Sequence, residues 1–178
     1  MTTWHGRHVP HDALWRLAKY HLAVLQDKQA RGVRQGIAYD GTSAIIAMAF
    51  AVEALLNFVG EQKLKSAWKE GASYPQKIKD LEARLVFKYE KSLEPYLTLE
   101  SLRRARKLLA HGKATTFLLG NASEDDVAAA LQPEWSQYTS PADVLATAQQ
   151  VDEFKNFILK RARIKPGTLF SSAWAEGE

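Results

Sequence analysis

The stretch Ala44–Val59, AIIAMAFAVEALLNFV, decides the fold of this chain. It is apolar almost throughout, but it is shorter than the roughly 20 residues that a membrane-spanning helix needs. It also contains Glu53 and Asn57, whose polar side chains are costly to place in lipid. We therefore predict a central, nearly fully buried helix over 44–58, ended by Gly60.

Helical periodicity continues on both sides of this stretch. Apolar residues recur at helical spacing in three further segments and in a long final segment. A short helix is predicted just before the final one. Two of these helices have a serine followed three residues later by an aspartate, the pattern of a capping box. The helices are predicted over 12–29, 76–89, 98–110, a short stretch after Ser123 and a long stretch after Ser140.

No segment alternates apolar and polar residues in the manner of a strand. There is no internal repeat and no linker long enough to divide the chain. The sequence therefore predicts a single all-α bundle of four to five main helices over 12–163. A flexible N-terminal segment over 1–11 and a C-terminal tail over 164–178 complete the predicted organisation.

The composition is that of an ordinary globular domain. The 178 residues are 46% hydrophobic and 25% charged, and the formal net charge of +4 permits an anionic partner without identifying one. Cysteine is absent, which excludes a disulfide framework, a thiolate nucleophile and a cysteine-ligated metal. A disulfide-free chain fits a reducing compartment, so we expect a cytoplasmic protein with no membrane association.

Histidines are concentrated near the N-terminus, with four of the five in the first 21 residues. His8, His11 and Asp12 contain ligand atoms, but their spacing matches no specific metal motif. Signatures for phosphate-binding loops, dinucleotides and zinc proteases are also missing. We therefore expect neither a metal nor a cofactor.

The chemistry-bearing part of the sequence is the stretch Leu102–Lys113, LRRARKLLAHGK. One interpretation is a solvated basic helix face whose final histidine interacts with the helix dipole. The other is an anion site, most naturally for phosphate, because arginine offers a fixed fork of donors and histidine exchanges a proton near neutral pH. The basic side chains are Arg103, Arg104, Arg106, Lys107, His111 and Lys113.

Helix geometry constrains this cluster. His111 is seven residues past Arg104 and lies about 20° from the same line, whereas it is five residues past Arg106 and about 140° away. One unbroken helix therefore directs Arg106 and His111 apart. They meet only if the helix frays near Gly112 or if a second chain supplies one of them.

Glu53 and Asn57 are four residues apart and share a face of the central helix. A buried carboxylate needs a cation or several donors. The arginines of the basic stretch are the obvious partners, with His111 next, and this predicts a link between the two segments. The alternative is that Glu53 marks the solvent edge of the helix.

The segments 43–60 and 102–113 together resemble the HEPN domain, a superfamily of α-helical bundles. Its hallmark is an arginine followed after four to six residues by a histidine. Arg106 and His111 match with four intervening residues, and Arg104 and His111 match with six. We favour Arg106 because a polar residue, here Lys107, usually follows the motif arginine, although many members have asparagine there. The resemblance covers roughly Asp12 to Arg163.

The resemblance implies a metal-independent endoribonuclease of a toxin–antitoxin, phage-defence or RNA-processing system. The expected partners are RNA, an antitoxin or other protein, and a second copy of the chain that completes a composite site. His111 is then expected to transfer protons, Arg106 to bind the phosphate and Glu53 to orient them. A non-catalytic HEPN-like module that binds RNA, a nucleotide or a protein is the alternative. The remaining supporting or binding residues are Asn57, Arg103, Arg104, Lys107 and Lys113.

Overall fold

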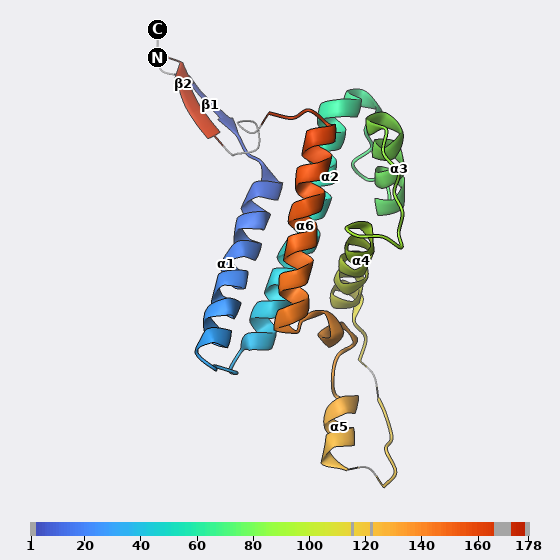
Figure 1. Ribbon diagram of the computed structural model, residues 1–178. Helices are drawn as coiled ribbons and strands as arrows, with labels where there is room; N and C mark the ends of the chain where they lie inside the picture. Colours follow the sequence, from blue (N-terminus) through green and yellow to red (C-terminus); the bar gives the residue numbers. More distant parts are fainter. Residues whose placement is uncertain (1–2, 115, 122, 166–171, 177–178) are drawn as a thin grey trace.

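The computed structural model describes residues 3–114, 116–121, 123–165 and 172–176. It is an all-α helical bundle, as predicted (Figure 1). Two 3-10 turns, Lys65–Ala67 and Glu134–Tyr138, connect the helices. The helices are α1 (Pro10–Ala30), α2 (Ile37–Leu64), α3 (Tyr74–Leu85), α4 (Tyr96–His111), α5 (Glu124–Ala130) and α6 (Pro141–Arg161).

Helix α2 is the centre of the bundle. It packs against α1, α3, α4 and α6 (Figure 1). An 18-residue window of the 31-residue segment Ile37–Ala67 has a mean hydropathy of 1.8, enough by length and composition to cross a membrane, yet 67% of that window is buried inside the bundle. Ile45, Met48 and Leu56 of this helix are completely covered. The apolar run therefore serves as the core of the fold.

Helix α2 extends beyond the predicted 44–58 at both ends and contains two glycines against which other residues pack. This close packing cannot be recognised from the spacing of the sequence. A Cβ on Gly41 would lie 2.6 Å from the carbonyl oxygen of Thr139, and one on Gly60 would lie 2.2 Å from the ring of Trp68. Both positions lie inside the helix and allow close approach. The prediction that Gly60 ends the helix is therefore wrong.

The other helix ends agree more closely with the sequence. Ser123 and Ser140 cap α5 and α6, each accepting a hydrogen bond from the backbone N–H three residues later. Helix α3 ends at Leu85, four residues earlier than predicted. Val86 there adopts a left-handed conformation (φ 55°) and its N–H bonds to the carbonyl of Glu82, which closes the helix.

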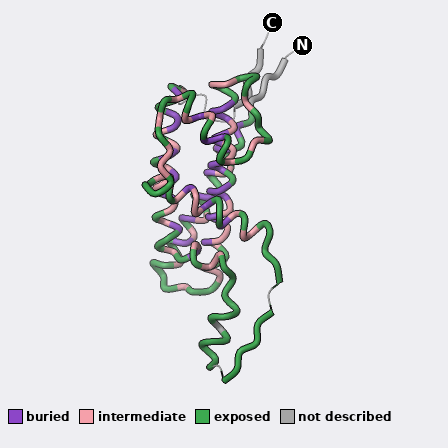
Figure 2. The backbone as a smooth tube through the Cα atoms, turned by 90° about the vertical axis from the view of Figure 1, so that its right-hand side faces the viewer, coloured by how far each residue is buried: buried purple, intermediate pink, exposed green. Residues whose placement is uncertain are grey.

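Between α4 and the second 3-10 turn, the chain leaves the bundle and returns. We call residues 112–133 the arm. It includes α5 and projects well beyond the end of the bundle (Figure 1). Every arm residue whose exposure the structure describes is exposed, in contrast to the buried centre of the bundle (Figure 2). No residue of the arm whose burial the structure describes belongs to the hydrophobic core.

The two ends of the chain meet. Strand β1 (Thr3–Arg7) pairs antiparallel with β2 (Ser172–Glu176), from Thr3 opposite Glu176 to Arg7 opposite Ser172. Sequence patterning predicted no strand in either segment. The paired residues are separated by nearly the whole length of the chain. Local periodicity cannot indicate a contact of this kind. It lies beyond one end of α1, away from the arm.

Candidate functional site

Helix α4 presents the basic cluster. Its buried face is formed by Leu99, Leu102 and Ala105, which pack on the core. The helix continues unbroken to His111 and ends at Gly112, whose backbone is extended (φ −53°, ψ 130°). The helix therefore does not fray before the histidine, so helix geometry directs Arg106 and His111 about 140° apart within one chain.

Arg106 is held by the carboxylate of Glu53. The Nη1 atom of Arg106 lies 2.7 Å from Oε2 of Glu53, which confirms the predicted link between the central helix and the basic cluster. The guanidinium also lies 4.8 Å from the ring centroid of Phe50. The side chain of Arg106 is nevertheless 42% exposed. This arginine is thus oriented by two contacts and remains open to a ligand.

Lys77, which was not among the residues predicted from the sequence, is a second cation on the same carboxylate. Its Nζ lies 3.5 Å from Oε1 of Glu53, and the residue is only 2% exposed. One sequence signal could have found it, because Lys77 lies one helical turn before Leu81, a core residue of α3. Lys77 and Arg106 together hold Glu53 between α3 and α4.

A neighbouring polar network occupies Arg103. Its guanidinium donates to Oε2 of Glu100 through Nε (3.1 Å) and Nη2 (2.9 Å), and the hydroxyl of Tyr89 donates to Oε1 (3.1 Å). Burial, and then the negative charge of Glu100, raise the pKa of Tyr89 far above its usual value of 10. Burial is also the largest cause of the raised pKa of Tyr74 beside it. Arg103 is therefore engaged within α4, and Tyr89 links the segment after α3 to the same glutamate.

Three predicted cations are exposed on or just past α4: Arg104, Lys107 and Lys113. Among the described residues, none of them makes an ion pair. Arg104 and Lys107 lie within about 60° of one another and of His111 on the helix surface, so they share its exposed face. We call Arg104 and Lys107 the basic row.

Asn57 lies one helical turn after Glu53. Within the described ranges, its buried Oδ1 has no hydrogen-bond partner. Buried polar atoms in proteins normally have a hydrogen-bond partner, so this oxygen is an exception within the central helix. The structure gives Asn57 no contact with the basic cluster.

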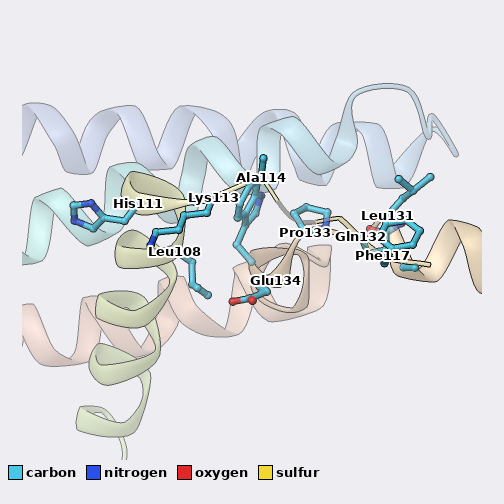
Figure 3. Close-up of a pocket in the computed structure, with 12 residues that line it drawn as sticks. Leu108, His111, Lys113, Ala114, Phe117, Leu131, Gln132, Pro133 and Glu134 are labelled. Carbon is cyan, nitrogen blue, oxygen red and sulfur yellow. The ribbon is translucent and has the colours of Figure 1, made fainter. Parts of the chain in front are cut away.

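His111 lies at the root of the arm, at the edge of a cleft of about 570 Å³. The cleft is lined by Leu108, Phe117, Leu131 and Trp135, with Lys113 beside them. The imidazole of His111 points away from Lys113 and Glu134 (Figure 3). It is exposed to solvent and thus accessible to a second molecule.

The described residues contain no group of three or more His, Cys, Asp or Glu side chains able to hold a metal ion.

The site residues that the sequence predicted divide into three parts. Glu53 and Arg106 come together, Arg103 is engaged elsewhere, and His111 shares its face with the basic row. No protein-family model matches the chain, and no curated protein or solved structure is significantly similar to it.

Proposed function

We propose that the protein is a metal-independent endoribonuclease of the HEPN type, in which Arg106 of one chain and His111 of a second chain act on one phosphate. The observation that carries the proposal is the contact of Arg106 with Glu53 at 2.7 Å, which orients an arginine that is still 42% exposed. A fixed, accessible guanidinium suits the recognition of a phosphodiester and of the charge that develops on it.

The reaction follows from these two groups. His111 takes the proton of the RNA 2′-hydroxyl, and the resulting oxygen attacks the adjacent phosphorus. Arg106 binds the non-bridging oxygens and stabilises their increased negative charge. The bond from phosphorus to the 5′-oxygen breaks, and that oxygen takes up a proton from water. The products are a 2′,3′-cyclic phosphate and a free 5′-hydroxyl.

Two chains are needed because α4 is continuous. The motif arginine and histidine point about 140° apart on one helix, so they cannot face the same phosphate from a single chain. A symmetric dimer that joins the C-terminal ends of two α4 helices removes this difficulty. Glu53 and Lys77 then act as positioning residues for Arg106.

The test is RNA cleavage in the presence of a chelator, with end-group analysis of the products. We expect cleavage by the wild type and a loss of about 100-fold or more in His111→Ala and Arg106→Ala. His21→Ala and Arg34→Ala, which change the same residue types away from the site, serve as matched controls. Equal cleavage by wild type and His111→Ala, or no cleavage of a broad panel of RNAs, would contradict the proposal.

A second candidate is a non-catalytic module that binds RNA or another polyanion. It is favoured by the basic row and Lys113, which are exposed and make no ion pair among the described residues. Such binding weakens steeply with salt, because each phosphate contact releases counterions. Binding without turnover that survives His111→Ala but disappears when Arg104 and Arg106 are neutralised would favour this candidate over the nuclease.

The resemblance further suggests a cytoplasmic role in a toxin–antitoxin or phage-defence system, with an antitoxin as protein partner. Induced expression of the wild type is then expected to arrest bacterial growth, and His111→Ala is expected to relieve the arrest at equal expression. Growth unaffected by the wild type would remove the toxin interpretation and leave the nuclease itself to the cleavage assay.

A further inference from the structure

The arm exposes large apolar side chains that the bundle does not cover. Leu118 is 98% exposed and Leu131 is 66% exposed. Single exposed apolar residues are ordinary on a protein surface, but several on one projecting segment mark an interaction site. The exposed apolar residues of the arm are Phe117, Leu118, Leu119, Val127 and Leu131.

Helix α5 also lacks support from within the chain. It has seven residues, and isolated helices much shorter than about 12–15 residues are marginal in water. Ser123 and Asp126 form a complete capping box that satisfies its first turn, but no described residue of α5 is buried. The helix therefore has a defined start and an uncovered surface.

The charges of the arm are complementary to those of α4. Helix α5 begins with Glu124 and Asp125, which are exposed and make no ion pair among the described residues. The basic row belongs to α4, and α4 and α5 extend from the root of the arm in opposite directions (Figure 1). One chain therefore holds the two sets of charges apart, and a second copy can bring them together.

We propose that two copies of this chain exchange arms, with the arm of each lying along α4 of the other. Glu124 and Asp125 of one copy then pair with Arg104 and Lys107 of its partner. Lys107 and Arg104 lie about 6 and 10 Å back along the helix axis from His111, on the face of α4 that the partner's arm then follows. The leucines of the arm then lie against the partner's Leu108, which is on the same side of α4 as the basic row.

This arrangement is a two-fold contact in which each copy offers the same pair of surfaces. Its axis passes near the C-terminal ends of the two α4 helices. His111 of one copy thereby approaches the end of the partner's α4, where Arg106 lies about 7.5 Å back along the axis. The inference rests on the proposed function for what the dimer does, while the arm and the basic row argue for the dimer independently.

Charge reversal tests the exchange through light scattering after size-exclusion chromatography. One variant combines Glu124→Lys and Asp125→Lys, and the other combines Arg104→Glu and Lys107→Glu. We expect a dimeric wild type, and each variant alone to be monomeric at the concentration where the wild type is dimeric. An equimolar mixture of the two variants is expected to form a heterodimer, because both contacts are complementary again.

Controls and one further variant complete the experiment. Lys69→Glu with Glu70→Lys reverses two exposed charges away from the arm and should leave the dimer intact, and circular dichroism should show that every variant is folded. Leu118→Asp keeps Glu124, Asp125 and the basic row but places a charge in the apolar contact, so it should also give a monomer. A monomeric wild type, variants that remain dimeric, or a mixture that stays monomeric would overturn the proposal.

These outcomes are separable from the proposed function because they measure mass and not cleavage. A dimer that responds to the charge reversals but cleaves no RNA would overturn the nuclease and leave the arm exchange standing. If the charge-reversal variants remain dimeric and cleave RNA, the arm exchange is overturned and the nuclease stands.

Discussion

The bundle and the arm contain similar apolar side chains, but those of the bundle are buried and those of the arm are exposed. Phe154 and Leu56 are completely covered in the bundle, whereas Leu118 in the arm is 98% exposed. Packing within one chain accounts for the bundle and does not account for the arm. The bundle is therefore stabilised by its own packing, and the exposed side chains of the arm are the basis for the proposed contact with a second copy.

Truncation of a large apolar side chain in each region should give the largest difference in stability between the bundle and the arm. Phe154→Ala should lower the free energy of unfolding by about 3–5 kcal/mol, because it removes buried contacts and leaves a cavity. Leu118→Ala should change it by less than about 0.5 kcal/mol at a concentration where the chain is monomeric. Urea unfolding measures both values. Equal losses would show that the arm packs on its own bundle.

The second contrast is between two glutamates. Glu53→Gln leaves the buried Lys77 without its carboxylate and should cost about 2–3 kcal/mol, less than a fully buried pair because the side chain of Glu53 is 30% exposed. Glu124→Gln in the arm should cost less than about 0.5 kcal/mol. Adding Lys77→Met to Glu53→Gln should recover part of the loss. Strict additivity of the two changes would contradict the pairing.

The third contrast is between two glycines. Gly60→Ala should lower the free energy of unfolding by about 1–2 kcal/mol, because the Cβ meets the ring of Trp68 at 2.2 Å and the gain in helix propensity offsets only part of the clash. Gly120→Ala in the arm meets nothing within 4 Å and should be neutral or slightly stabilising. Thermal unfolding ranks the two. A neutral Gly60→Ala would mean that α2 and Trp68 separate at little cost.

The smallest expected effect is the loss of the Asp126 capping contact of α5 at low pH. Hydrogen bonds from the hydroxyl and the N–H of Ser123 lower the pKa of Asp126 below its ordinary value of 3.8. Because the folded pKa is depressed, this capping contribution is complete above pH 3.8 and is lost as the pH falls through the lower folded pKa. The amide resonances of α5 should shift over that range, while Asp126→Asn removes the response. An unchanged titration in the variant would contradict the assignment.

Local chemistry explains what could be predicted. The Ser123 and Ser140 caps depend on residues three apart, and the contact of Glu53 with Arg106 follows from the need of a sheltered carboxylate for a cation. The all-α fold follows from helical periodicity in the same way. Each of these features is encoded in short spacings or in a single unfavourable burial.

Long-range packing explains what was missed. Gly60 resembles a helix stop until Trp68 is seen against it, and Lys77 resembles a surface lysine until α3 is docked beside Glu53. The pairing of β1 with β2 depends on the two ends of the chain meeting. The exposed arm has ordinary composition, so its lack of cover becomes visible only in three dimensions.

The most direct test of a site shared between two chains is complementation in the RNA cleavage assay. His111→Ala and Arg106→Ala should each be inactive alone. Mixed after dissociation and reassociation, half of the dimers are mixed and each has one intact site, so about a quarter of wild-type activity should return. A mixture that forms mixed dimers but stays as inactive as its components would contradict a site made by two chains.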